Sequence, residues 1–406
     1  MRFLNYYKIN IKYIFVTLAL WSYPIAASIS ILFNTSPESS LISNSLRLLV
    51  ICLGIIILFK KFPVLKLNLS LSNKFLFIFL FIYLFRIIYD LYLFDIVSLV
   101  PKEKYLYIHF FSNIFGLLVL STLNINNNDL KVILKASKYI ILICLIINLY
   151  FGFDQYIYAI ISEVTTLRIS NLKFSPIQLG HLSAILILLS FFKFDGLINK
   201  ISIFDKFSIL LALIGVILAN SKTPILALII IFVIYFYSKN RSIIKLYKSF
   251  LFFCFFLLVT AILAKEILLI DISGRFISTF NESEVSTTSR LHIFSEGIDL
   301  FFSNPIIGSR SVTSSGGYPH NLFIEILMST GMVGIILISL PILKLKNVIN
   351  EIRFGMTPLT LIYLIAIEYF IAFQTSFAMY QATNLFILLF IIGSKKNIKN
   401  ENFNII

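Results

Sequence analysis

Residues 75–94 read FLFIFLFIYLFRIIYDLYLF, and this stretch decides the fold class. It has the length that an α-helix needs to cross the hydrocarbon core of a bilayer, about 20 residues. Its only charged residues are Arg86 and Asp90, which stand four positions apart and can pair on one helix face. Because a lone charge in lipid is costly, we interpret the stretch as a transmembrane helix whose two charges neutralise each other or line a cavity.

Similar apolar stretches recur along the whole chain. Besides residues 75–94, candidate spans cover residues 13–33, 41–59, 105–123, 139–158, 177–192, 207–220, 223–237, 250–270, 321–343, 358–377 and 379–394. Of all residues 59% are hydrophobic and 13% are charged, whereas a soluble domain has about 25% charged residues. We therefore predict an all-α, polytopic integral membrane protein with about 12 transmembrane helices.

The predicted chain forms a single membrane domain, residues 1–406, with one large loop inside it. Residues 1–270 hold the first nine predicted helices, residues 271–320 form the loop, and residues 321–406 hold the last three. The small residues Ala26 and Ala27 in the first span also resemble a signal-peptide cleavage site. Cleavage there would leave every later orientation unchanged.

The basic residues of the loops decide the orientation. Counted in alternation from the N-terminus, one set of loops holds 23 of the 34 Lys and Arg residues, so the positive-inside rule assigns that side to the cytoplasm. An even number of spans then puts both termini in the cytoplasm. The net charge of +15 follows from these loop residues, so we expect no nucleic-acid partner. The opposite, outward loops hold eight basic residues: Lys102, Lys104, Arg168, Lys173, Lys222, Arg275, Arg290 and Arg310.

Two outward loops are long, residues 154–176 and 271–320. Long loops in compact proteins usually carry function or are disordered, and the second loop contains a helical pattern. Ser289 can cap a helix over residues 290–303, which would lie on the outer membrane surface. Arg290 would sit at the edge of its apolar face and point along the headgroup plane. Four residues would form that apolar face: Leu291, Phe294, Ile298 and Phe301.

The outward loops combine cations with a histidine that directly precedes the tenth predicted span. An arginine guanidinium binds phosphate through a planar fork of donors. A neutral imidazole, here that of His320, can accept the proton of a sugar hydroxyl. Together these groups suit the attack of a hydroxyl on a sugar carbon that bears a diphosphate leaving group. The candidate diphosphate ligands are Arg168, Arg275, Arg290, Arg310 and Lys222.

Metal-binding patterns are weak in this sequence. An Asp-x-Asp pair, the usual clamp for a sugar nucleotide, does not occur, and we interpret Glu282-Ser283-Glu284 as a solvated turn. The three cysteines lie inside apolar runs at spacings that match no metal site or disulfide framework. We therefore expect a metal-independent reaction without a cofactor.

Three short runs, SRLHIF (289–294), NPIIG (304–308) and PHNLFIE (319–325), are followed by Gly331 and Gly334. This pattern resembles the O-antigen polymerase and O-antigen ligase family. These proteins are bacterial inner-membrane glycosyltransferases that use undecaprenyl-diphosphate-linked glycans. Members have about a dozen spans and a large periplasmic loop near the ninth and tenth. The motif covers residues 289–334, and the layout of this chain agrees with the family over its whole length.

The resemblance implies roles for individual residues. His320 aligns with the loop histidine that acts as general base, and Arg290 aligns with the loop arginine that holds the diphosphate. Lys222, after Ser221, stands where the family has Ser-Arg, and a lysine keeps the charge but loses the bidentate fork. Arg168 resembles an outward arginine before the sixth span, although Gly180 lies one residue beyond the family spacing. The candidate substrate ligands are thus Arg310, Arg168, Lys222, Arg275 and Asn321.

We favour a polysaccharide polymerase that joins lipid-linked repeat units, because Lys222 departs from the family pattern as polymerases do. The expected partners are an undecaprenyl-diphosphate-linked oligosaccharide, membrane lipid and a chain-length regulator membrane protein. A ligase that transfers the glycan to the lipid A core remains an alternative. A flippase is an alternative of another class, and it would place charge on several spans. We interpret His181 as structural, His292 as solvent-facing, and Glu325 and Glu368 as carboxylates that face the bundle interior.

Overall fold

A computed structural model describes most of the chain. The described residues are 10–33, 41–62, 67, 69–93, 108–161, 174–192, 202–240, 285–314 and 316–395, with six single residues between 244 and 265. The secondary-structure elements of this part are all helical. Six of its helices are long and apolar enough to cross a membrane, and four shorter apolar helices accompany them. The prediction of an all-α, polytopic membrane protein is therefore confirmed.

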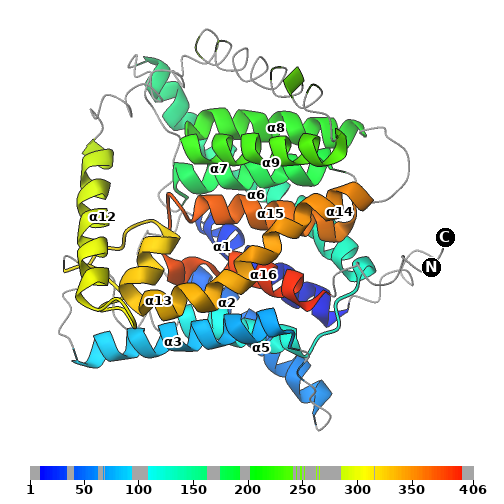
Figure 1. Ribbon diagram of the computed structural model, residues 1–406. Coiled ribbons are helices and arrows are strands. Elements are labelled where there is room, and N and C mark those ends of the chain that lie inside the picture. Colours follow the sequence, from blue (N-terminus) through cyan, green and yellow to red (C-terminus); the bar gives the residue numbers. More distant parts are fainter. Residues whose placement is uncertain are drawn as a thin grey trace.

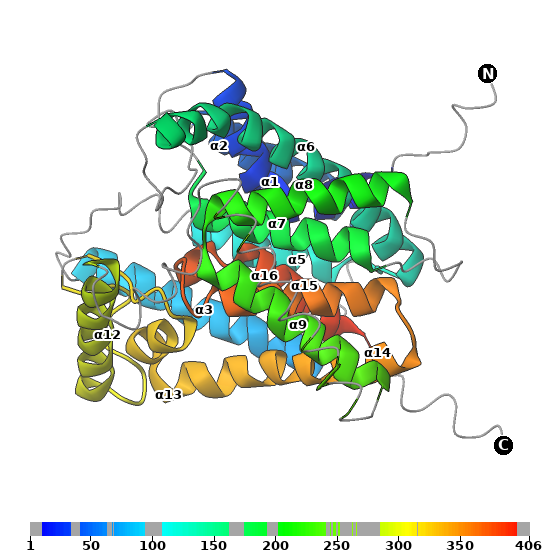
Figure 2. The same ribbon diagram turned by 90° about the horizontal axis from the view of Figure 1, so that it is seen from above.

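Most helices run roughly parallel to one another and form the bundle (Figures 1 and 2). In chain order the longer elements are α1 (Ile11–Leu32), α2 (Leu41–Lys61), α3 (Leu71–Leu93), α6 (Asn127–Ile161), α7 (Pro176–Phe191), α8 (Ile203–Ala219), α9 (Lys222–Asn240), α12 (Val285–Ser303), α13 (Leu322–Leu343), α15 (Pro358–Ala372) and α16 (Thr383–Ser394). Shorter elements connect them: the π-helix η1 (Ile108–Phe115), α5 (Gly116–Ser121), the 3-10 turns η2 (Lys344–Asn347) and η3 (Met379–Gln381), and α14 (Val348–Phe354).

The predicted spans agree with these helices except at some boundaries. The ninth predicted span, residues 250–270, lies almost wholly outside the described residues. Helix α6 begins at Asn127, well before the predicted residue 139, while α15 already ends at Ala372. At 1.5 Å per residue the 15 residues of α15 reach about 22 Å, which is less than the thickness of the hydrocarbon core. The turn after α15 therefore lies inside the bundle, where Phe373 O accepts a hydrogen bond from Leu322 N at the start of α13 (2.8 Å).

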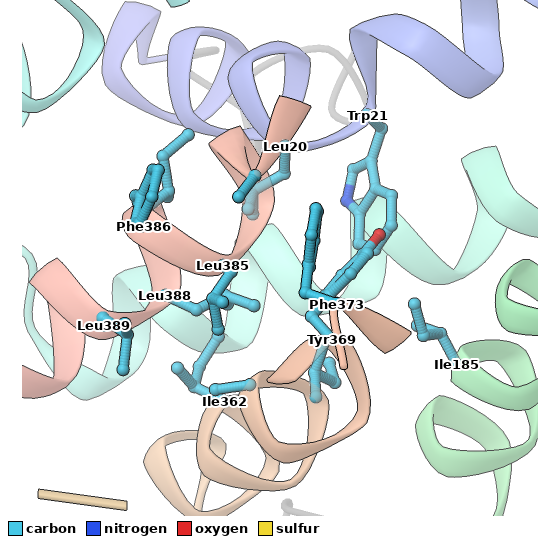
Figure 3. Close-up of a cluster of buried hydrophobic side chains, with 14 of the residues drawn as sticks. Leu20, Trp21, Ile185, Ile362, Tyr369, Phe373, Leu385, Phe386, Leu388 and Leu389 are labelled. Atoms are coloured by element: carbon cyan, nitrogen blue, oxygen red, sulfur yellow. The ribbon is translucent and has the colours of Figure 1, made fainter. Parts of the chain in front are cut away.

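Helices α15 and α16 form the centre of the bundle. Residues 358–369 of α15 and 385–393 of α16 are buried without interruption, as expected of helices that other helices surround on every side. Figure 3 shows Trp21 of α1 and Ile185 of α7 beside Tyr369 and Phe373. The Trp21 indole donates to the hydroxyl of Ser137 on α6 (2.6 Å), which satisfies its buried N–H group.

Both ends of the described chain lie at one end of the bundle. Lys12 pairs with Asp129 at the start of α6 (2.7 Å), and Lys395 donates to the carbonyl of Ile125. Lys61 at the end of α2 donates to the Thr122 carbonyl of the same turn. Helix α12 lies at the opposite end of the bundle (Figures 1 and 2).

Helix α13 is broken at Gly331, whose φ of +62° and ψ of −156° are not helical. A break frees backbone groups, and an unsatisfied group in hydrocarbon costs several kcal/mol. The segment after α12, residues 304–311, pairs with these freed backbone groups. Met332 N donates to Pro305 O (2.9 Å), and Ser309 N donates to Met328 O (2.7 Å). The NPIIG motif therefore fills the break in α13.

Gly308 and Gly331 make this contact possible, because each meets backbone of the other segment. A Cβ atom on Gly308 would lie 2.4 Å from the Ser329 carbonyl carbon, and the residue has a φ of +73°. We expect Gly308→Ala to lower the free energy of unfolding by about 1–3 kcal/mol from overpacking, with backbone strain in addition. Thermal unfolding in detergent measures the effect. Gly355→Ala is the matched control, because Gly355 shares a positive φ (+131°) but has open space. Equal losses in both variants would contradict the steric argument.

Candidate active site

Helix α12 is longer than the sequence indicates. It begins at Val285, so Ser289 lies within the helix, and the prediction of Ser289 as its cap is wrong. Serine and threonine have ordinary helix propensity, so a serine marks a possible start without preventing the helix from beginning earlier. The predicted end at residue 303 is confirmed, since Ser303 is the last helical residue.

The face of α12 that packs against the bundle runs through Gly297. A Cβ atom there would lie 2.8 Å from Ile324 of α13, so α12 crosses α13 in close contact. Leu291 and Ile298 of the predicted apolar face are 54% and 43% exposed. Arg290 lies two turns before Gly297 on the inner face, and its side chain points toward the end of the bundle. Its predicted direction along the headgroup plane stays a prediction. The helix itself runs across the ends of the bundle helices, as a surface helix would (Figure 1).

Arg290 docks on the turn between α15 and α16. Its Nη1 donates to the carbonyl of Thr375 (3.2 Å), and the Thr375 hydroxyl bonds to that of Thr223 (2.8 Å). Thr223 follows Lys222, the first residue of α9. The 373–382 turn thus contacts both the guanidinium of Arg290 on α12 and the start of α9, where Lys222 precedes Thr223.

His320 sits immediately before α13 in a left-handed backbone conformation, with φ +54°. Asn321 follows it as the N-cap: Oδ1 accepts from Ile324 N (3.1 Å), and Nδ2 donates to Gln374 O (2.9 Å). Both polar atoms of this side chain therefore have structural partners, and its role as a substrate ligand stays a prediction. The cap and the turn together fix the position of the neighbouring histidine.

The ring of His320 packs against an aromatic side chain and lies near the charge of Arg290. It packs edge-on against Tyr318 (centroids 4.6 Å apart), and Tyr318 contacts Tyr380 (6.2 Å). The Nδ1 atom is buried and has no hydrogen-bond partner among the described residues. Burial lowers the pKa of His320, and the charge of Arg290 lowers it further. The imidazole is therefore neutral at pH 7, which is the state that can accept a proton.

This pKa direction predicts a pH profile. If neutral His320 accepts the proton, activity should fall only as the pH drops through a value below about 6.5, the ordinary pKa of histidine. Arg290→Gln removes a positive charge that disfavours protonation, so the pKa of His320 rises and the acid limb of its residual activity moves to higher pH. The rate of sugar transfer, measured between pH 4.5 and 8, gives the acid limb of the wild-type protein and that of Arg290→Gln. An acid limb that stays in place in Arg290→Gln would contradict this assignment.

The other predicted cations have different positions. Arg310 lies in the segment that fills the α13 break, where its N–H donates to Met328 O (3.1 Å) and its charge interacts with Asp90. Arg168 and Arg275 lie outside the described residues. The structure thus brings His320, Arg290 and the Lys222 hairpin to the 373–382 turn, and places Arg310 beside α3.

Two buried carboxylates beneath the site have partners that the sequence did not indicate. Glu325 of α13 accepts from Met379 N (2.9 Å) and from the Tyr83 hydroxyl (3.2 Å), so it ties the site turn to α3. Glu368 of α15 contacts His181 Nδ1 of α7 (2.5 Å). Apolar surroundings predict that such groups need partners, but the partners come from distant helices. Among the described residues, no group of three His, Cys, Asp or Glu side chains could hold a metal ion.

Comparison with known proteins gives one family match. Residues 207–339 match the family model described as O-Antigen ligase. The match contains the Lys222 hairpin, α12 and His320, so the resemblance to the polymerase and ligase family is confirmed over this region. A search of curated proteins found no match. The helices are those of a multi-pass membrane protein, and residues 207–339 are similar to the O-antigen ligase family. This similarity suggests a glycosyltransferase-like enzyme and does not separate polymerase from ligase.

Proposed function

We propose that this protein polymerises a polysaccharide by glycosyl transfer between undecaprenyl-diphosphate-linked repeat units. The growing glycan on its lipid diphosphate is the donor, and a hydroxyl at the non-reducing end of one lipid-linked repeat unit is the acceptor. The reaction needs no metal, because protein cations neutralise the leaving group. The setting is the periplasmic face of the inner membrane, with both termini in the cytoplasm.

One observation carries the proposal: a neutral histidine and an arginine from separate elements meet at the bundle end opposite both chain ends. Arg290 is close enough to His320 to lower its pKa, and Thr375 holds the guanidinium in place. A base beside a cation suits a reaction in which a hydroxyl loses a proton while a diphosphate gains charge.

The proposed reaction has three steps in which protein side chains take part. The acceptor oxygen bonds to the anomeric carbon of the donor as the bond from that carbon to the diphosphate breaks. His320 takes the hydroxyl proton. The diphosphate leaves with its electron pair, and Arg290, Arg310 and Lys222 stabilise its charge, together with Arg168 and Arg275. Besides the lipid-linked glycan, membrane lipid and a chain-length regulator membrane protein are the proposed partners.

Ligation to the lipid A core is the second candidate. The description of the matched family, O-Antigen ligase, favours it. The donor, the base and the diphosphate ligands would be the same, and only the acceptor would differ. The departure of Lys222 from the family arginine leads us to place the polymerase first.

The surface-glycan ladder of a strain that lacks the gene tests the two functions. A polymerase predicts surface glycan reduced to one repeat unit on its lipid anchor. A ligase predicts loss of anchored glycan, with long chains left on undecaprenyl diphosphate. An unchanged ladder would exclude both, and restoring the gene should return the original pattern.

A further inference from the structure

Arg86 of α3 lies where the segment after α12 meets the break in α13. Its guanidinium donates four hydrogen bonds, each to a backbone carbonyl. Nε donates to Ser329 O (2.9 Å), Nη1 to Ser309 O (3.0 Å), and Nη2 to Gly308 O (2.9 Å) and Ile307 O (3.1 Å). These carbonyls belong to both sides of the contact, so Arg86 joins the segment to the broken helix.

Asp90, one turn further along α3, contacts both Arg86 and the segment after α12. Its Oδ2 accepts from Ser311 N (2.5 Å), and its Oδ1 lies 3.7 Å from Nη1 of Arg86. The Asp90 side chain is 1% exposed and that of Arg86 is 13% exposed. The pair therefore does more than neutralise two charges in a span, because it fixes the backbone on both sides of Arg310.

The shape of the guanidinium explains the choice of arginine. It offers donors at three nitrogen atoms in a rigid plane, and the four carbonyls use all three. A lysine offers its donors from a single atom and could not reach carbonyls from both segments at once. Since Arg310 N also donates to Met328 O, the position of Arg310 depends on the same contact.

We propose that Arg86 and Asp90 are positioning residues that act through Arg310, by holding its backbone where the guanidinium meets the diphosphate of the lipid-linked substrate. This inference rests on the proposed function, in which Arg310 is a diphosphate ligand. Arg86 itself stays on the carbonyls and does not touch the substrate.

A double-mutant cycle on the full-length protein in nanodiscs tests this role, with undecaprenyl diphosphate as the probe. Arg310→Ala should raise the Kd about ten- to hundredfold, as expected for the loss of a hydrogen bond to a charged group. Arg86→Lys should raise it about tenfold in the wild-type background and less than about twofold in the Arg310→Ala background. A merely structural role would weaken binding equally in both backgrounds. Arg353→Lys, exposed on α14 at the other end of the bundle, is the control.

The outcomes separate this inference from the proposed function. Equal losses in the two backgrounds, or no loss in Arg86→Lys, would overturn the positioning role and leave Arg310 as a ligand. An unchanged Kd in Arg310→Ala would remove Arg310 from the site and overturn the inference with it, while the glycan ladder still decides the function. If Arg86→Lys does not fold, Asp90→Asn takes its place in the same cycle, because it keeps the side-chain shape and removes the charge.

Discussion

His320→Asn should reduce the rate of sugar transfer by about 10²–10⁴-fold while leaving the bundle folded, because that is the usual contribution of a general base. Asparagine is the sharper substitution, since His320 has a φ of +54° and asparagine tolerates this left-handed conformation better than alanine does. The amide keeps polarity at the site and has no basic nitrogen. His320→Ala should give a similar loss of activity together with some loss of stability.

The matched control is His292→Asn. His292 is exposed on α12, so its replacement should leave the rate unchanged. The measurement is the initial rate of glycan extension by purified protein, with the unfolding temperature of each variant alongside. Full activity of a folded His320→Asn protein would remove His320 from the reaction.

Arg290→Gln should lower kcat by about 10²–10³-fold, the effect of removing one group that stabilises developing charge. The glutamine amide ends two bonds short of the Nη1 that donates to the Thr375 carbonyl, so the unfolding temperature of the variant shows whether the docking of α12 on the 373–382 turn is kept. Arg290→Lys should recover part of the activity, because it restores the charge without the planar fork.

Arg353→Gln provides the control for Arg290, since Arg353 is exposed at the other end of the bundle. Rates measured over a range of donor concentrations separate kcat from KM. A change in KM alone would mean that Arg290 only binds the donor, and no change in either constant would exclude it from the site.

The sequence predicts the class of this fold well, because a membrane span needs a long apolar run and such runs are plain to see. The ends of spans are harder. Residues 373–378 read FQTSFA and mix polar with apolar residues, and Phe373 and Ala378 are buried in the turn (4% and 0% exposed). A turn inside a bundle buries apolar side chains as a helix does, so hydropathy does not show at which residue the helix stops.

The site could be predicted in part. The motif pointed to His320 and Arg290, and a signal for the direction of Arg290 was present in the sequence. Gly297, two turns later on the same face, marks the side on which α12 approaches α13. The predicted apolar face of α12 indicated a different side of the helix, and its residues Leu291 and Ile298 are exposed. Large apolar residues on a surface helix can face lipid, so they do not mark the side that packs against the bundle.

The role of Arg86 could not be predicted. Its pairing with Asp90 follows from the spacing of four residues, and the structure confirms that pair (3.7 Å). Its four carbonyl partners lie more than 200 positions away in the sequence, and they are available only because α13 breaks at Gly331. Every residue has a backbone carbonyl, so the sequence does not show which distant carbonyls a side chain will contact.

The most direct test of the central claim is extension of a lipid-linked repeat unit by the purified protein in liposomes, without added metal. We predict a ladder of glycans that grow by whole repeat units, with one undecaprenyl diphosphate released for each bond formed, and no ladder from His320→Asn. A wild-type protein that extends nothing, or that transfers glycan only when lipid A core is supplied, would contradict polymerisation.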